Sequence, residues 1–340
     1  MTWWGNAGEA STPSRASSLA PSRERRPPRR GRLRRGLLAA LVTAAVVVPV
    51  SAAAAHPEIP APAPARIGTV TATTLDRAYA ANRANAAEAS RMAAAHGDHG
   101  RASAVRAMAD PSRHHLSFDA RGSGRAVEVL GDLAEADRVA VLVPGSDTTL
   151  DTYERFREGA LALHHRLGAR AAVVAWLGYE TPGTISPEVL TMGRAEEAGP
   201  ELRSFIGQLR GLNDRARISL LCHSYGTAVG ARVASGPDIS DLVFFGSPGT
   251  GAGSVAELRT TARVWAGRGA DDWIADVPHG EADLFGTTVG FGTDPVSPAF
   301  GARVFAAGDG GHSDYFRPGS ESLENLARIV LGRTSEVTRA

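Results

Sequence analysis

The stretch RISLLCHSYG, residues 217–226, decides which fold the sequence predicts. Residues 217–222 are almost continuously apolar, which is typical of a strand buried on both faces. The next residues place Ser224 between Cys222 and Gly226, a spacing that matches the G-x-S-x-G turn in which a strand passes sharply into a helix. Such a turn lifts the serine hydroxyl out of the sheet, and the following helix directs its N–H groups towards developing negative charge. Ser224 is therefore the candidate nucleophile.

Strands and helices alternate on both sides of this stretch. The apolar runs predict a leading hairpin and then strands that alternate with helices. That order indicates an α/β fold with a mostly parallel sheet covered by helices on both faces, in which sites lie at the carboxyl ends of strands. The expected strands are 115–120, 126–130, 138–143, 171–176, 217–222, 241–245, 262–265 and 302–305, and the expected helices are 153–167, 194–212 and 320–331, with another after Ser224.

A helical lead-in is expected between a linker and this main domain. Its helices are predicted at 74–96 and 102–109, and the mostly alanine face of the first must rest on another element. The cluster His96-Gly97-Asp98-His99 between them resembles a metal site, but an exposed turn is the favoured reading. We assign 56–65 to a Pro/Ala linker, 66–112 to the lead-in, 113–334 to the main domain and 335–340 to a tail.

Residues 1–55 have the composition of an export signal. An Arg- and Pro-rich block at 23–35 precedes an apolar run at 37–50, and small alanines follow at 52–55. These are the parts of a secretory signal peptide. Two alternatives stay open: a twin-arginine signal at Arg34-Arg35, and an uncleaved anchor just long enough to span a bilayer. We expect an exported protein, secreted or attached to the cell envelope, that meets a membrane only through this segment if it is uncleaved.

Composition excludes several classes of function. Nine of the chain's 37 basic residues lie in residues 1–55 with two acidic ones, which leaves 28 basic and 34 acidic residues beyond, a net charge of −6. That sign argues against a nucleic-acid partner. The single cysteine, Cys222, excludes an intrachain disulfide and a thiolate metal cluster. Without a phosphate-binding loop or a G-x-G-x-x-G turn after a first strand, we expect no cofactor and no metal.

Two further strand ends carry an acid and a base for Ser224. Asp272 follows the strand at 262–265 beside two large apolar residues, with Asp271 as its competitor and Asp276 as a more distant one. His312 follows the last strand in a glycine-rich loop that lets it reach across the sheet, whereas His279 lies away from a strand end. A histidine that takes the serine proton and an acid that orients the imidazole are what a serine nucleophile needs. Ser224, His312 and Asp272 are the predicted triad.

Backbone donors for an oxyanion are expected on two loops. The N–H of Tyr225 directly follows the nucleophile. Pro144 has no N–H, so the loop after residues 138–143 offers the N–H of Ser146 or, as the second choice, of Gly145. His223 adjoins the serine, but neighbouring side chains in this turn point apart, so we expect it to pack beneath the turn.

Substrate-binding residues are harder to assign from sequence. Trp176 and Tyr179, with Leu177, follow a strand and are candidates for an acyl pocket, and equally for the core. Residues 183–197 are a candidate lid. An exported, cofactor-free serine hydrolase of this kind is expected to act on a small-molecule ester or acyl substrate.

The sequence resembles the α/β-hydrolase superfamily, and in particular the DUF1023-type α/β hydrolases. The resemblance covers about residues 70–332, and its stretches are 141–145, 176–182, 222–226, 272–275 and 311–315. It implies an α/β-hydrolase fold over 113–334 and the chain order Ser, Asp, His. Cys222 departs from the family's usual glycine.

The activity expected from this pattern is ester hydrolysis through an acyl-enzyme. The same triad also serves amidases and peptidases, and a cell-surface binding protein that keeps the fold without activity is a further alternative.

Overall fold

The computed structural model describes residues 59–277, 281–284 and 287–340. The described residues all belong to one compact unit, Glu58–Ala340. The predicted export signal, the start of the linker and His279 lie outside the described residues. Over those residues, no helix combines the length and the apolar composition needed to cross a membrane.

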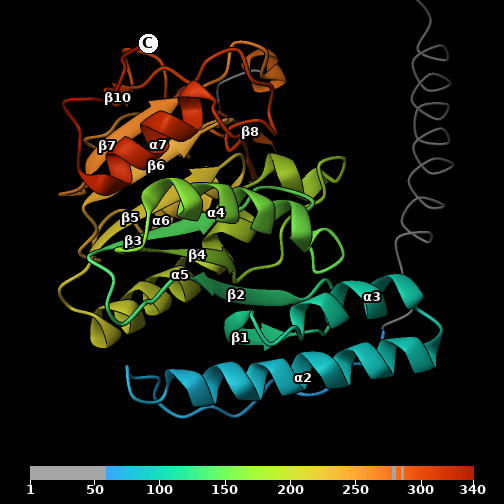
Figure 1. Cartoon of the computed structure of the whole chain (residues 1–340). Coiled ribbons are helices and arrows are strands. Elements are labelled where there is room, and N and C mark those ends of the chain that lie inside the picture. Colours follow the sequence, from blue (N-terminus) through green and yellow to red (C-terminus); the bar gives the residue numbers. More distant parts are fainter. Residues whose placement is uncertain (1–58, 278–280, 285–286) are drawn as a thin grey trace, which may run out of the picture. The chain divides into compact units, whose positions relative to one another are not determined.

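This unit contains a large sheet, which within the described residues has the strand order β1-β2-β4-β3-β5-β6-β7-β10 (Figure 1). The hairpin β1–β2 is antiparallel, β2 also pairs antiparallel with β4, and the remaining neighbours are parallel. The predicted mostly parallel sheet is thereby confirmed. The strands are β1 His114–Asp119, β2 Arg125–Leu130, β3 Arg138–Val143, β4 Ala171–Leu177, β5 Arg217–His223, β6 Asp241–Phe245, β7 Arg263–Gly267 and β10 Arg303–Val304.

The strand order reverses at β3, and this reversal places the site. From β3 the chain moves to β4 on one side, and then returns past β3 to β5 on the other side. Val143 pairs with Cys222, so the two central strands end level with each other. A crevice forms where neighbouring connections leave a sheet in opposite directions, at the carboxyl ends of its strands.

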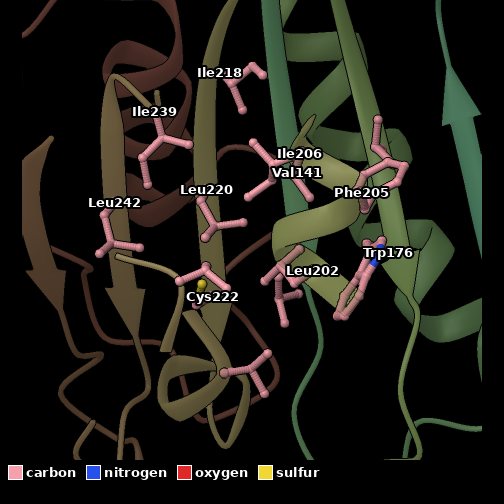
Figure 2. Packing of buried hydrophobic residues seen from close by; sticks show 14 of the residues in the cluster. Val141, Trp176, Leu202, Phe205, Ile206, Ile218, Leu220, Cys222, Ile239 and Leu242 are labelled. Atoms are coloured by element: carbon pink, nitrogen blue, oxygen red, sulfur yellow. The ribbon is translucent and has the colours of Figure 1, made fainter. Parts of the chain in front are cut away.

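Helices cover both faces because each central strand is apolar on both sides. Helix α4 (Tyr153–Leu167) and helix α7 (Glu321–Leu331) bury Leu163 and Leu326 in a core shared with Leu142 and Leu221. Helix α5 (Gly193–Leu212) and helix α6 (Gly226–Arg232) cover the opposite face. Figure 2 shows that second core, where Leu202 of α5 faces strand residues such as Val141.

The lead-in consists of α2 (Leu75–His96) and α3 (His99–Met108), which pack against each other and against β1 (Figure 1). The alanine face of α2 is buried there, as expected. Asn82 of α2 donates to the carbonyl of His115 over 2.8 Å. Helix α3 begins three residues earlier than predicted, because the Asp98 carboxylate accepts the N–H of Arg101 at 2.8 Å and caps it.

Several short elements were not predicted. These are two 3₁₀ turns, η1 (Pro187–Leu190) and η2 (Trp273–Asp276), and the antiparallel pair β8 (Glu281–Leu284) and β9 (Thr287–Gly290). Each spans four residues, too few for a hydrophobic period to be visible. Strand β10 is also shorter than expected.

Candidate active site

Ser224 sits on the sharp turn between β5 and α6. Its φ angle is +53°, in the left-handed region that residues with a side chain seldom adopt. Gly226 makes this turn possible, because a Cβ there would lie 2.5 Å from the carbonyl oxygen of Pro144. Backbone strain of this kind is concentrated at functional sites.

Cys222 fits the turn because of a second glycine. Its thiol is buried, and burial raises the pKa of that thiol well above its usual value. A Cβ on Gly230 of α6 would lie 2.3 Å from Cys222 Sγ. The sulfur therefore occupies the space that the missing side chain of Gly230 leaves open, and Figure 2 shows it in the core beneath the turn.

His312 connects Ser224 to Asp272. Its Nε2 lies 2.9 Å from Ser224 Oγ, and its Nδ1 lies 2.8 Å from Asp272 Oδ1. Residues separated by 88 and 40 positions in the chain thus form one hydrogen-bonded row. The order of contacts is the one in which a histidine removes the serine proton while a carboxylate orients the ring.

Asp272 is held as a buried carboxylate. Burial by itself raises its pKa, but hydrogen bonds from His312, from Tyr315 and from the N–H of Ile274 outweigh burial and lower the pKa. Tyr315 Oη lies 2.5 Å from Asp272 Oδ2, and the Ile274 nitrogen 2.9 Å from Oδ1. The competing Asp271 and Asp276 are exposed.

His223 packs under the catalytic loop. Its ring lies 4.7 Å from the ring of His312 and 5.2 Å from that of Phe245. Its Nε2 donates to the backbone carbonyl of His312 over 2.8 Å. Burial is the main reason that its pKa falls to about 3, so the ring is neutral and serves as a donor.

The expected oxyanion donors lie on either side of Ser224. A Cβ on Gly145 would lie 2.5 Å from Ser224 Cβ, so glycine alone lets this loop approach the nucleophile. In the described part of the chain, the N–H groups of Ser146 and Tyr225 have no hydrogen-bond acceptor. The side chain of Tyr225 points away, because its hydroxyl donates to the carbonyl of Thr191 at 2.8 Å.

A cleft of about 850 Å³ opens above the nucleophile. Its wall includes Ser224, His312 and residues 142–148. The 183–197 segment contributes Thr184 and Val189 to the wall. The cleft also reaches α4, a contribution that sequence reasoning missed.

Trp176 and Tyr179 do not line this cleft. Both are buried with their rings stacked 5.9 Å apart, and Figure 2 shows Trp176 beside Leu202 and Phe205 of α5. The core alternative is therefore the correct one for these two residues. Tyr179 instead supports the loop before Gly145, because its hydroxyl donates to the carbonyl of Pro144 at 2.7 Å.

Tyr315 is the residue that sequence reasoning left without a role. It lies three positions after His312, yet nothing local shows that its hydroxyl reaches Asp272. The His96–His99 stretch, in contrast, forms the turn between α2 and α3. Throughout the described residues, no group of three His, Cys, Asp or Glu side chains is arranged to hold a metal ion.

Comparison with known proteins finds a family match and several relatives. The family described as "Alpha/beta hydrolase" matches residues 119–282. The uncharacterized protein Rv2079 of Mycobacterium tuberculosis is 31% identical over 247 residues, which cover 62% of this chain and 37% of that protein. The uncharacterized protein Rv0963c of the same species is 30% identical over 135 residues, 36% of this chain and 51% of that protein. The chain thus spans little more than a third of the length of the first relative.

Solved structures with a related architecture are more distant. The α/β serine hydrolase XC6422 from Xanthomonas campestris, described as without a lid, has 17% identity and a TM-score of 0.42, over 66% of this chain and 95% of that one. Esterase PE8 has 16% identity and a TM-score of 0.41, over 60% and 96%. The narrower likeness to DUF1023-type proteins stays a prediction. The family match over residues 119–282, the mostly parallel sheet and the helices on both faces give the chain an α/β-hydrolase fold.

Proposed function

We propose that the protein is a serine hydrolase that cleaves carboxylic esters through an acyl-enzyme. The observation that carries the proposal is the hydrogen-bonded row Asp272–His312–Ser224 at the floor of an open cleft. Each member has the environment that its role needs: a strained serine, a histidine bonded on both nitrogens and a buried carboxylate.

In the first half-reaction, Ser224 Oγ attacks the acyl carbon while its proton passes to His312 Nε2. Asp272 stabilises the imidazolium that forms. The oxyanion is positioned to accept the N–H groups of Tyr225 and Ser146, each worth about 3–4 kcal/mol in comparable sites. His312 then protonates the leaving alkoxide, and the acyl group stays on Ser224.

In the second half-reaction, water takes the place of the alcohol. His312 removes a proton from water as it attacks the acyl-enzyme, and returns that proton to Ser224 Oγ as the acid departs. Every proton passes through the same nitrogen, Nε2 of His312, which accepts the hydrogen bond of the Ser224 hydroxyl before the reaction begins.

Labelling with a fluorophosphonate tests the proposal. The purified protein should bind one probe at Ser224, and Ser224→Ala and His312→Ala should abolish binding and lower kcat by at least about 10⁴-fold. Ser313→Ala is the matched control, because Ser313 is an exposed serine on the same cleft wall and should leave labelling unchanged. A folded wild type that takes up no probe would contradict the proposal and favour a protein without catalysis.

We also propose that residues 1–55 export the protein. Their Arg-rich block and apolar run support this. Cell fractionation with mass measurement of the N-terminus tests it. A secreted product that begins after residues 53–55 indicates cleavage, a full-length membrane-bound product indicates an anchor, and a cytoplasmic product would refute export.

A further inference from the structure

The cleft extends from Ser224 along one side of α4. Helix α4 contributes Arg155, Phe156, Glu158, Gly159 and Ala162 to its wall. Side chains at these spacings share one face of a helix. From Phe156 to Ala162 the helix rises about 9 Å, so the cleft continues well beyond the space that a short acyl group fills.

Most of the side chains that line this part of the cleft are apolar; of its charged residues, Arg155, Glu158 and Arg317 are exposed. Phe316 and Pro318 line the cleft on the segment that follows His312, and Leu142, Leu221 and Phe245 line it where three central strands end. We call the part formed by Phe156, Gly159, Ala162, Phe316 and Pro318 the α4 arm. Its charged neighbours on the helix, Arg155 and Glu158, are exposed and meet solvent. A polar substrate chain would lose its hydration there without gaining partners, whereas an apolar chain would not.

Gly159 sets the position of the Phe316 ring. A Cβ at this position would lie 2.9 Å from the Phe316 ring, so the glycine lets that ring seat against the helix. The ring is fixed from its other side by an edge contact with Phe245 at 5.5 Å. The α4 arm therefore has a rigid aromatic wall that connects directly to the loop of the catalytic histidine.

From these features we infer that the substrate is an ester with a long apolar chain, and that this chain lies in the α4 arm. The inference rests on the proposed ester hydrolysis and adds the class of ester to it. The arm begins at the nucleophile and continues along an apolar wall. The rate of hydrolysis should therefore depend on the length of the substrate's apolar chain.

Two series of esters, used below their critical micelle concentrations, test the inference. One series lengthens the acyl group from p-nitrophenyl acetate to p-nitrophenyl octanoate, and the other lengthens the alcohol of an acetate ester. Each methylene buried should raise kcat/KM about threefold to fourfold. We expect a rise of at least about 100-fold along one series, and the series that responds identifies which part of the ester the arm holds.

Variants of the α4 arm make the test specific. Ala162→Trp should lower the long-to-short ratio of kcat/KM by at least about tenfold, because the indole fills the arm. His165→Trp places the same indole at an exposed position of α4 outside the cleft and should keep the wild-type ratio. Phe316→Ala, which widens the arm without adding bulk, should shift preference towards branched chains.

The outcomes separate this inference from the proposed function. A protein that hydrolyses short esters and binds the fluorophosphonate, but shows no length dependence in either series, would overturn the inference alone. The same conclusion follows if length dependence survives Ala162→Trp unchanged. A protein that neither binds the probe nor hydrolyses any ester would instead overturn the proposed function.

Discussion

Tyr315 Oη lies 2.5 Å from Asp272 Oδ2, to which it donates. Tyr315 Oη also accepts the N–H of Gly269 at 3.1 Å. Tyr315 follows His312 by three residues, so the loop that carries the base also holds the acid. Burial is the main reason that the pKa of Tyr315 lies far above its usual value, so the phenol stays a neutral donor. The two oxygens of Asp272 are thus used separately, one for His312 and one for Tyr315.

Removal of this hydroxyl should weaken the triad without disturbing the core. Tyr315→Phe keeps the ring contacts with Phe245 but leaves Asp272 Oδ2 and the Gly269 N–H without their buried partner. We expect kcat to fall about tenfold to 100-fold while KM changes little, since one unsatisfied buried group costs about 1–3 kcal/mol. Steady-state kinetics on a short ester measure this, with Tyr153→Phe as a control at a buried tyrosine away from Asp272. An unchanged kcat would show that Tyr315 only fills space.

The His223 hydrogen bond should position the catalytic loop. His223→Phe keeps the stacking on Phe245 but removes the donor to the His312 carbonyl, and should lower kcat about tenfold. His223→Gln carries an N–H donor at a similar reach and should recover part of the loss. Rates of fluorophosphonate labelling give the same comparison without turnover. If Phe and Gln behave alike, packing rather than the hydrogen bond would be the role of His223.

Cys222 and Gly230 should be coupled in stability. Gly230→Ala brings a methyl against Cys222 Sγ and should lower the free energy of unfolding by about 1–3 kcal/mol. Cys222→Ala removes the sulfur, after which the nearest Cys222 atom to the new methyl is Cβ at 3.4 Å. The double variant should therefore be more stable than the sum of the two single effects predicts, by about 1–2 kcal/mol.

Urea denaturation of the four proteins measures this cycle. Gly207→Ala is the control, because Gly207 lies in α5 and a Cβ there has no neighbour within 4 Å. That change should stabilise the protein by about 0.5–1 kcal/mol. Strict additivity at positions 222 and 230 would refute the fit described here.

Two buried histidines should make the fold sensitive to mild acid. Burial is the main cause that lowers the pKa of His115 from 6.5 to about 4, beside Glu128, Arg113 and Arg157. Between these two pH values His115 is protonated in the unfolded chain but not in the folded chain. The free energy of unfolding therefore falls as pH drops through this window, by about 3 kcal/mol in total for His115. His223, with its pKa of about 3, adds a loss of the same sign.

Denaturation at a series of pH values from 7 to about 4 tests this linkage. His115→Gln should flatten the slope by up to about 1.4 kcal/mol per pH unit, because the neutral amide has no proton to gain. A slope that is the same in the wild type and in His115→Gln would contradict the assignment.

Local sequence patterns were enough to predict the main helices and strands of the fold. Helix α4 and strands β3 and β6 have the predicted bounds, because continuous apolar runs and helical periodicity act within a few residues. The short turn η2 escaped prediction because the Asp272 carboxylate creates it by capping the Ile274 N–H. A carboxylate that is both a cap and a triad member has no distinct signature in sequence.

The same limit applies to the substrate side of the site. Trp176 follows its strand as a pocket residue would, yet it faces α5 and lies in the core. Ala162 looks like an ordinary helix residue, yet it lines the cleft. Which way a side chain faces depends on what packs against its element, and that partner lies far away in the chain.

Short-range sequence patterns account for the mostly parallel sheet, the sharp turn at Ser224 and the three strand ends that carry a nucleophile, an acid and a base. Those features depend on short-range sterics and on the burial of apolar runs. Folding over longer distances is what brings Asp272 rather than its neighbour Asp271 to His312, places Tyr315 against the acid and extends the cleft along α4. These contacts join residues 40 or more positions apart, and they exist only after the sheet has closed and each loop has taken its place at the sheet's edge.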